Sequence, residues 1–166
     1  MKYKFLSHTA DIKFQAFGKT IEEAFENCSL ALINIITKDK IKSRNNKKIL
    51  INVKGNDYES LLVNFLEKFL FLFETKGFLL SKINKIKITN KTTKSMINKT
   101  DKFNDKNLKV NNINNKFSYV LECEVIGDKL DKNNYEISNH VKAITYNDMF
   151  VKKEKNKFIT QVVVDV

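Results

Sequence analysis

Two stretches of the chain carry apolar residues at the spacing of a single helical face. Thr20 and Glu23 match a capping box at the start of the first stretch, while Asn56 and Glu59 offer a cap for the second and Gly77 its end. The pattern predicts two core-facing helices, the second reaching about Thr75. Their apolar positions are Ile21, Ala24, Phe25, Cys28, Ala31, Leu32, Ile35 and Ile36, then Leu61, Leu62, Phe65, Leu66, Phe69, Leu70, Leu72 and Phe73.

Alternating and extended apolar segments predict strands elsewhere. Turn residues at Gly127-Asp128, Asn147-Asp148 and Asn156 favour an antiparallel meander in the last third of the chain. Two helices among seven or eight strands predict an α+β fold, a two-layer domain in which a mostly antiparallel sheet packs against the two main helices. The predicted strands are 3–7, 12–17, 48–54, 78–89, 117–126, 140–146, 150–153 and 157–166.

Length and composition fit one domain spanning residues 1–166, with 42% hydrophobic residues to build a core. The net charge of +11 suggests an anionic partner, but nearly half of this charge lies in one segment. Residues 90–116 contain seven Lys, two Asp and eight Asn, so this segment supplies +5 of the excess. We expect a disordered Lys/Asn-rich insert there. It would either attract phosphates weakly or be a solvated insertion without a partner.

Several classes of protein are excluded by what the sequence lacks. It has no leader, no apolar run long enough for a membrane helix and no lipidation signal, which predicts a soluble, cytoplasmic protein, with a nuclear location also open. Cys28 and Cys123 fit no metal or redox motif and are predicted to be buried thiols. Glycine-rich phosphate loops and the aromatic pattern of RNA-recognition strands are absent as well.

Oxygen chemistry remains, carried by residues near the two ends of the chain. Asp11 precedes an early strand, and Asp165 stands beside Val166 at the end of the last one. If these strands are neighbours, the two carboxylates and the terminal carboxylate of Val166 would offer hard ligands to Ca²⁺ or Mg²⁺. In a chain this basic, such a cluster is a candidate site. The alternative is that Asp11 caps a turn and Asp165 sits on a frayed end.

Lys142 is a second unusual position. Its strand is predicted to place it on the same face as Ile144 and Tyr146, where apolar side chains gather. It would reach a carboxylate or a partner's phosphate, or else extend past the sheet edge into water.

The ordered set of motifs resembles the archease family, small activator proteins of the RtcB-type tRNA-splicing ligase. The resemblance spans the chain outside residues 90–116, and no single block carries it alone. Its blocks are His8-Thr9-Ala10-Asp11-Ile12, residues 18–27, residues 58–62 with 70–77, Val141-Lys142-Ala143-Ile144-Thr145-Tyr146, and Gln161-Val162-Val163-Val164-Asp165-Val166.

The resemblance implies an α+β fold with split β-α-β units and a protein that is not itself an enzyme. It implies a partner, the RtcB-type ligase, whose guanylylation and multiple turnover in tRNA splicing it would promote, reaching RNA only through the ligase. Asp11, Asp165 and Val166 match the family's divalent metal site, with Ca²⁺ expected and Mg²⁺ or Mn²⁺ as alternatives. Asp11, Lys142 and Asp165 match its ligase-activating residues, and His8 is a supporting candidate.

Two departures from the family pattern limit this expectation. The family commonly has His where this chain has Tyr135 and Asn147, so neither position is expected to act as an imidazole. Two other functions stay open from the sequence. One is an autonomous metal-dependent phosphoesterase that uses the same carboxylates, and the other is a general RNA-binding or chaperone module that relies on the basic segment.

Overall fold

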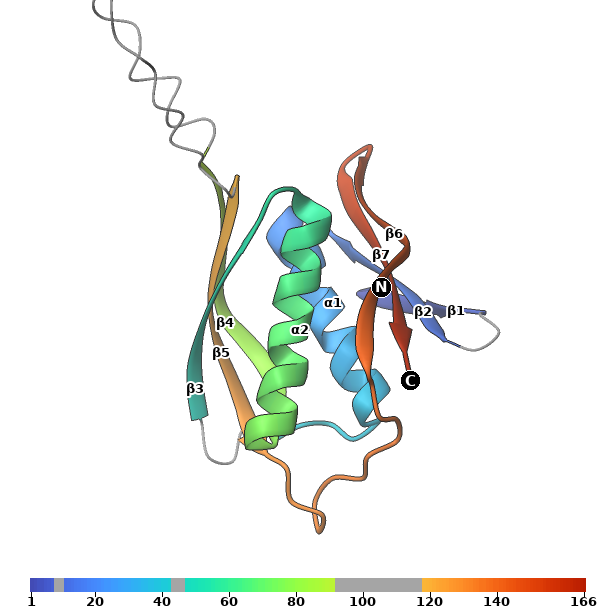
Figure 1. Cartoon of the computed structure of the whole chain (residues 1–166), viewed down its shortest axis with the longest axis vertical. Helices are drawn as coiled ribbons and strands as arrows, with labels where there is room; N and C mark the ends of the chain where they lie inside the picture. Colours follow the sequence, from blue (N-terminus) through green and yellow to red (C-terminus); the bar gives the residue numbers. More distant parts are fainter. Residues whose placement is uncertain (8–10, 43–46, 92–117) are drawn as a thin grey trace, which may run out of the picture.

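The computed structural model describes residues 1–7, 11–42, 47–91 and 118–166, which form two antiparallel sheets with two helices between them (Figure 1). The first sheet has the order β1-β2-β7-β6, and the second has the order β3-β5-β4. The strands are β1 (Tyr3–Leu6), β2 (Ile12–Gly18), β3 (Lys47–Gly55), β4 (Phe78–Asn90), β5 (Tyr119–Lys129), β6 (Ala143–Glu154) and β7 (Lys157–Asp165), and the helices are α1 (Ile21–Ile36) and α2 (Tyr58–Lys76).

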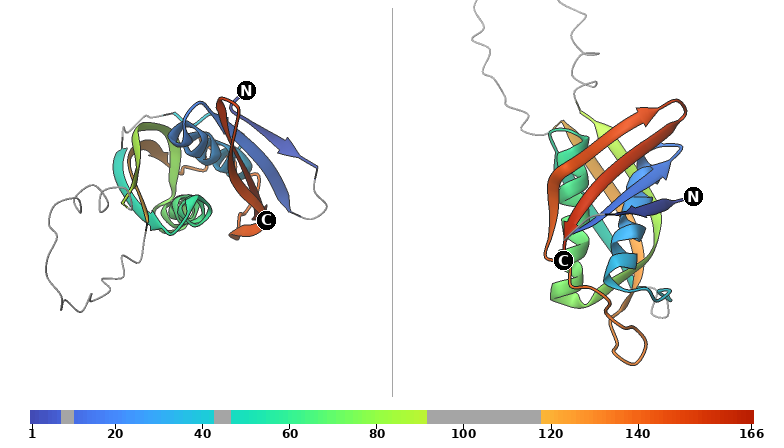
Figure 2. Two further views of the ribbon diagram at one scale, coloured as in Figure 1. Left: turned by 90° about the horizontal axis from the view of Figure 1, so that it is seen from above. Right: turned by 90° about the vertical axis from the view of Figure 1, so that its right-hand side faces the viewer.

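The predicted α+β class, the two helices and the antiparallel pairing are confirmed. The layering differs from the prediction, because two sheets flank the helices where one sheet was expected (Figure 2). Each helix packs against strands of both sheets, so the core has apolar side chains on both sides of the helix layer. Phe65 of α2 lies at its centre, with its ring centroid 6.2 Å from that of Phe25 and 5.0 Å from that of Phe69.

The second sheet contains the expected split β-α-β unit. Strands β3 and β4, joined by α2, both run antiparallel to β5, which lies between them. They are therefore parallel to each other, and the helix between them covers the inner face of the sheet. The predicted meander in the last third of the chain is therefore wrong for β5, which pairs with β3 and β4. Of the strands in that third, β6 and β7 pair with each other as predicted.

The predicted helix caps are partly confirmed. Thr20 caps α1 by accepting a hydrogen bond from the Glu23 amide, while the Glu23 carboxylate accepts from the Lys19 amide, one residue earlier than expected. The predicted cap of α2 is wrong by one residue. Asp57 accepts from the Ser60 amide, and the Ser60 hydroxyl accepts from the Asp57 amide, which completes a reciprocal capping box.

Gly127 and Asp128 do not form the predicted turn, because both lie inside β5. Gly127 allows a close approach between neighbouring strands: a Cβ there would stand 2.2 Å from the carbonyl oxygen of Leu79 and 2.5 Å from the Phe78 ring. The strand needs glycine at this position because any side chain would collide with β4.

Strand β6 replaces two shorter predicted strands. It runs through Asn147 and Asp148 as a bulge, across which the pairing with β7 changes from Thr145↔Val163 to Phe150↔Gln161. Residues 140–142 precede the strand. The chain just before them is tied to the end of α1, where the amide of Ser138 donates to the Ile36 carbonyl at 2.8 Å.

Cys28 and Cys123 are free and buried, as predicted. The Cys28 thiol lies 2.8 Å from the Thr160 hydroxyl on β7. No described helix is both long enough and apolar enough to cross a membrane. The predicted insert, apart from Asn90 and Lys91, falls outside the described residues.

Candidate functional site

The register between β2 and β7 brings the two predicted aspartates together. Ile12 pairs with Val164 and Lys13 pairs with Val163. Continuing this register by one residue places Asp11 opposite Asp165, and cross-strand neighbours have Cβ atoms about 4.5 to 5.5 Å apart. Phe14 and Val164, which have the opposite parity, belong to the core cluster. The Asp165 side chain is 46% exposed, although Val163, two residues earlier on the same face, is fully buried.

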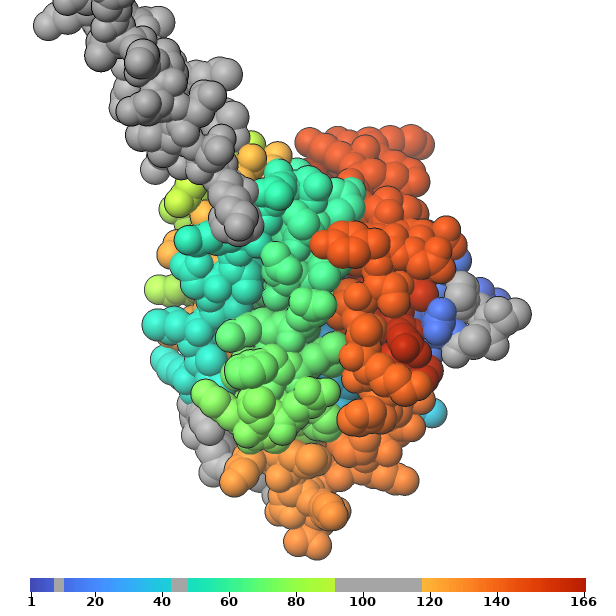
Figure 3. Space-filling model, viewed as in Figure 1, coloured from blue at the N-terminus to red at the C-terminus, as the bar shows by residue number. Residues whose placement is uncertain are grey.

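Lys142 and Val166 complete the cluster. The Lys142 ammonium donates to the main-chain oxygen of Val166 at 2.9 Å and lies 3.8 Å from Oδ1 of Asp165. The Lys142 amide donates to the Asp165 carbonyl at 2.9 Å, which fixes the lysine backbone beside the last strand. We call Asp11, Lys142, Asp165 and Val166 the terminal cluster. Figure 3 shows the end of the chain at the surface, between β6 in orange and the start of β2 in blue.

The environment of Lys142 differs from the prediction. Its side chain is 60% exposed and does not share the apolar face of Ile144, because residue 142 precedes β6. Val141 is the buried neighbour. The predicted reach towards a carboxylate is seen, but an ion pair at 3.8 Å between exposed groups adds little stability. The lysine is therefore available to a partner.

The remaining predicted positions are less informative. His8 lies outside the described residues. Tyr135 is buried, and its hydroxyl donates to Oδ2 of Asp128 at 2.8 Å, which makes it part of the packing beneath β5. Asn147 lies in the bulge of β6.

The terminal cluster is a small surface site that contains oxygen donors and both negatively and positively charged groups. Its carboxylates and the Val166 oxygen are hard donors of the kind that Ca²⁺ and Mg²⁺ prefer. Within the described residues no group of three His, Cys, Asp or Glu side chains forms a metal site. The terminal cluster would therefore supply only part of the ligand shell of a cation, and the Lys142 ammonium already places a positive charge there.

Sequence reasoning missed a polar network next to the terminal cluster. On the same outer face, the Lys13 ammonium donates to Oδ2 of Asp148 at 2.8 Å, and the Gln15 amide donates to Gln161 at 2.8 Å. The alternation of Lys13 and Gln15 with buried Phe14 marked the outer face of β2. The contact with Asp148 left no sequence signal, because it depends on the bulge of β6.

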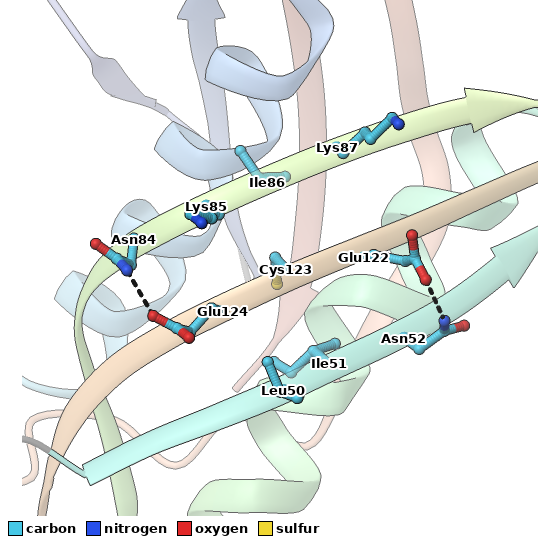
Figure 4. A pocket seen from close by; sticks show the side chains of 10 residues that line it. All are labelled: Leu50, Ile51, Asn52, Asn84, Lys85, Ile86, Lys87, Glu122, Cys123 and Glu124. Carbon is cyan, nitrogen blue, oxygen red and sulfur yellow. Dashed lines mark hydrogen bonds between the residues drawn. The ribbon is translucent and has the colours of Figure 1, made fainter.

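A hollow of about 820 Å³ lies on the outer face of the β3-β5-β4 sheet (Figure 4). Its carboxylates are engaged within the sheet: Glu124 accepts from Asn84, and Glu122 accepts from Asn52. The hydrogen bond from Asn84, with help from Lys48, holds the pKa of Glu124 below its ordinary value. None of the predicted site residues lines this hollow. We therefore assign the candidate site to the terminal cluster, which contains the predicted carboxylates and lysine.

Comparison with known proteins agrees with this architecture. A model of the archease protein family matches residues 3–166. A protein archease from Methanosarcina barkeri is 34% identical over 99% of this chain and 96% of its own length. A protein archease from Pyrococcus furiosus is 32% identical over 99% of both chains, and a protein archease-like from Drosophila melanogaster is 30% identical over 100% of this chain and 91% of its own.

Solved structures share the fold. The solution structure of Methanobacterium thermoautotrophicum protein 1598 superposes with a TM-score of 0.72 at 24% identity, covering 99% of each chain. A crystal structure of an archease from Thermotoga maritima gives a TM-score of 0.54 at 15% identity, covering 98% of this chain and 96% of its own. Family match, sequence identity and architecture agree over the full length of the chain, which belongs to the archease family.

Proposed function

We propose that this protein activates an RtcB-type tRNA-splicing RNA ligase, promoting guanylylation of the ligase and its multiple turnover, with a divalent cation, Ca²⁺ in the first instance, held at the terminal cluster. The observation that carries the proposal is the register that sets Asp11 opposite Asp165, beside Val166 and Lys142. Membership of the archease family supports the choice of partner.

The residues of the chain would contribute charge and position. Asp11 directly precedes β2 and Asp165 ends β7, and these two strands are hydrogen-bonded neighbours. The fold would therefore set the spacing of the two backbones before any partner arrives. Such preorganisation lets a protein orient charged groups without paying for their ordering on binding. A divalent cation, when bound, supplies charge neutralisation for phosphate oxygens.

Lys142 has a separate role in this proposal. Its ammonium is exposed and attached to the cluster through the Val166 oxygen, with Asp165 close by. The Lys142 ammonium would contact an anionic group of the ligase or its nucleotide, next to the carboxylates that would hold the cation. The lysine backbone stays in place, because its amide is bonded to the Asp165 carbonyl.

The proposal is tested by multiple-turnover RNA ligation and by guanylylation of the cognate ligase, each with and without this protein. Asp11→Asn and Asp165→Asn remove charge and preserve shape, and each is expected to lower the stimulation at least about tenfold. Their thermal unfolding should match that of the wild type, because both positions lie on the outer face. Glu74→Gln, an exposed acid on α2, is the matched control and should stimulate fully.

Full stimulation by both aspartate variants would refute the role of the cluster. A phosphoesterase assay without ligase distinguishes an autonomous hydrolase from an activator, because only the hydrolase releases product alone. RNA binding that is as strong without ligase as with it, and unaffected by either aspartate variant, would favour the RNA-binding alternative.

A further inference from the structure

Lys13 lies close enough to the terminal cluster to disturb it. It follows Asp11 by two residues on the same face of β2, so their Cα atoms are about 6.5 to 7 Å apart along the strand. Its pairing partner Val163 precedes Asp165 by two residues. A lysine side chain spans about 6 Å, so from this position the ammonium can reach either aspartate.

The ammonium is instead held in the opposite direction. It donates to Oδ2 of Asp148 at 2.8 Å, with the Lys13 side chain only 17% exposed. The Asp148 carbonyl accepts from the Gln161 side-chain amide at 2.8 Å, which places Asp148 beside the row of Gln15 and Gln161. That row is two residues further from Asp165 than Lys13 itself, on the face seen in the right panel of Figure 2.

The bulge of β6 fixes Asp148 in this position. Asp148 has a φ of 49°, in the left-handed region that Asp, Asn and Gly tolerate best. It sits in the extra residues between Thr145 and Phe150, where the register with β7 shifts. The carboxylate that contacts Lys13 therefore comes from the bulge.

We propose that Asp148 is a positioning residue of the terminal cluster, holding the Lys13 ammonium towards the Gln15–Gln161 row so that it does not neutralise Asp11 and Asp165. The reason is electrostatic. A second ammonium at the cluster, in addition to that of Lys142, would make the site more positive by one unit charge. A divalent cation would then meet a less negative site that already contains two competing cations. This inference rests on the proposed cation site.

The test uses the full-length protein and calcium chloride as the probe, with isothermal titration calorimetry at low ionic strength. Asp148→Asn keeps a residue that tolerates the left-handed conformation and removes only the charge. We expect it to weaken Ca²⁺ binding about tenfold. Lys13→Met in the same chain should restore affinity to within about threefold of wild type, and Lys13→Met alone should bind at least as tightly as wild type. Unchanged affinity in Asp148→Asn, or no rescue by Lys13→Met, overturns the proposal.

A crystal structure of calcium-free Asp148→Asn separates this inference from the proposed function. We expect the Lys13 Nζ atom within about 4 Å of a carboxylate oxygen of Asp11 or Asp165. This result would support the positioning role even if the wild type bound no Ca²⁺ and stimulated no ligase. A Lys13 side chain that stays beside residue 148, or that points into solvent, would overturn the inference whatever the ligation assays give.

Discussion

Replacing Tyr135 by Phe tests how the connection between β5 and β6 is held in place. Tyr135 is 5% exposed, and its hydroxyl donates to Oδ2 of Asp128, itself 4% exposed, at 2.8 Å. The same hydroxyl accepts from the Lys42 amide at 3.2 Å. One oxygen thus joins β5, the segment after α1 and the connection that leads to Lys142.

The expected cost follows from these two bonds. A hydrogen bond to a charged, buried partner contributes about 1.5 to 3 kcal/mol, and the bond from an amide on an exposed residue contributes about 0.5 to 1 kcal/mol because water replaces part of it. We therefore expect Tyr135→Phe to lower the free energy of unfolding by about 2 to 4 kcal/mol. For a chain of this size that corresponds to a fall in Tm of about 5 to 15 °C.

Urea denaturation and calorimetry measure the change. Tyr146→Phe is the matched control, because it removes the same hydroxyl from a side chain that is 60% exposed, and it should change stability by less than about 0.5 kcal/mol. Equal effects of the two substitutions would refute the reasoning, since burial of the bonded hydroxyl would then contribute nothing. Ligase stimulation by the folded Tyr135→Phe protein should stay near that of the wild type, because the β2–β7 register is untouched.

Two further predictions concern the buried interior. Gly127→Ala should cost about 2 to 3 kcal/mol in urea denaturation, because its Cβ would overlap the Leu79 carbonyl and the Phe78 ring, and a wild-type midpoint would contradict that close approach. Burial raises the pKa of both Cys28 and Cys123 to about 12, so at pH 8 iodoacetamide should label neither thiol in the folded protein and both in guanidinium chloride, as read by mass spectrometry. Because the unfolded thiols titrate near pH 9, their contribution to stability should be constant below about pH 8 and decline as the pH rises from 9 towards 12.

The spacing of apolar residues was sufficient to predict the two helices but not to identify the residues that cap their N-termini. The eight apolar positions predicted for α1 are all buried, because residues at helical spacing lie on one side of the helix and that side faces the core. The start of α2 contains two overlapping capping patterns, from Asn56 and from Asp57. Asp57 is the cap because its backbone is extended, with φ −139°, and its carboxylate meets the Ser60 amide. The sequence alone does not distinguish these patterns.

Pairing between strands could not be derived from local pattern. Gly127 and Asp128 have turn chemistry, yet they continue β5, because β4 approaches too closely for a side chain at residue 127. The division into two sheets likewise depends on contacts between distant segments, such as β2 with β7. The terminal cluster was foreseen because it requires one pairing only. Lys13 and Asp148 require that pairing and a bulge as well, which is why their contact was missed.

The register that forms the terminal cluster is maintained by the core, which ties the site to the stability of the whole sheet. Phe14 on β2 and Val162 and Val164 on β7 are fully buried on the inner face. Because side chains alternate along a strand, a slip of β2 by one residue would turn Phe14 out of the core and Asp11 towards it. Loss of one buried apolar side chain costs about 1.5 to 3 kcal/mol, and burial of an unpaired charge adds to that cost. The spacing of Asp11 and Asp165 therefore needs no ligand to define it, and neutral substitutions at the site should alter binding without loosening the fold.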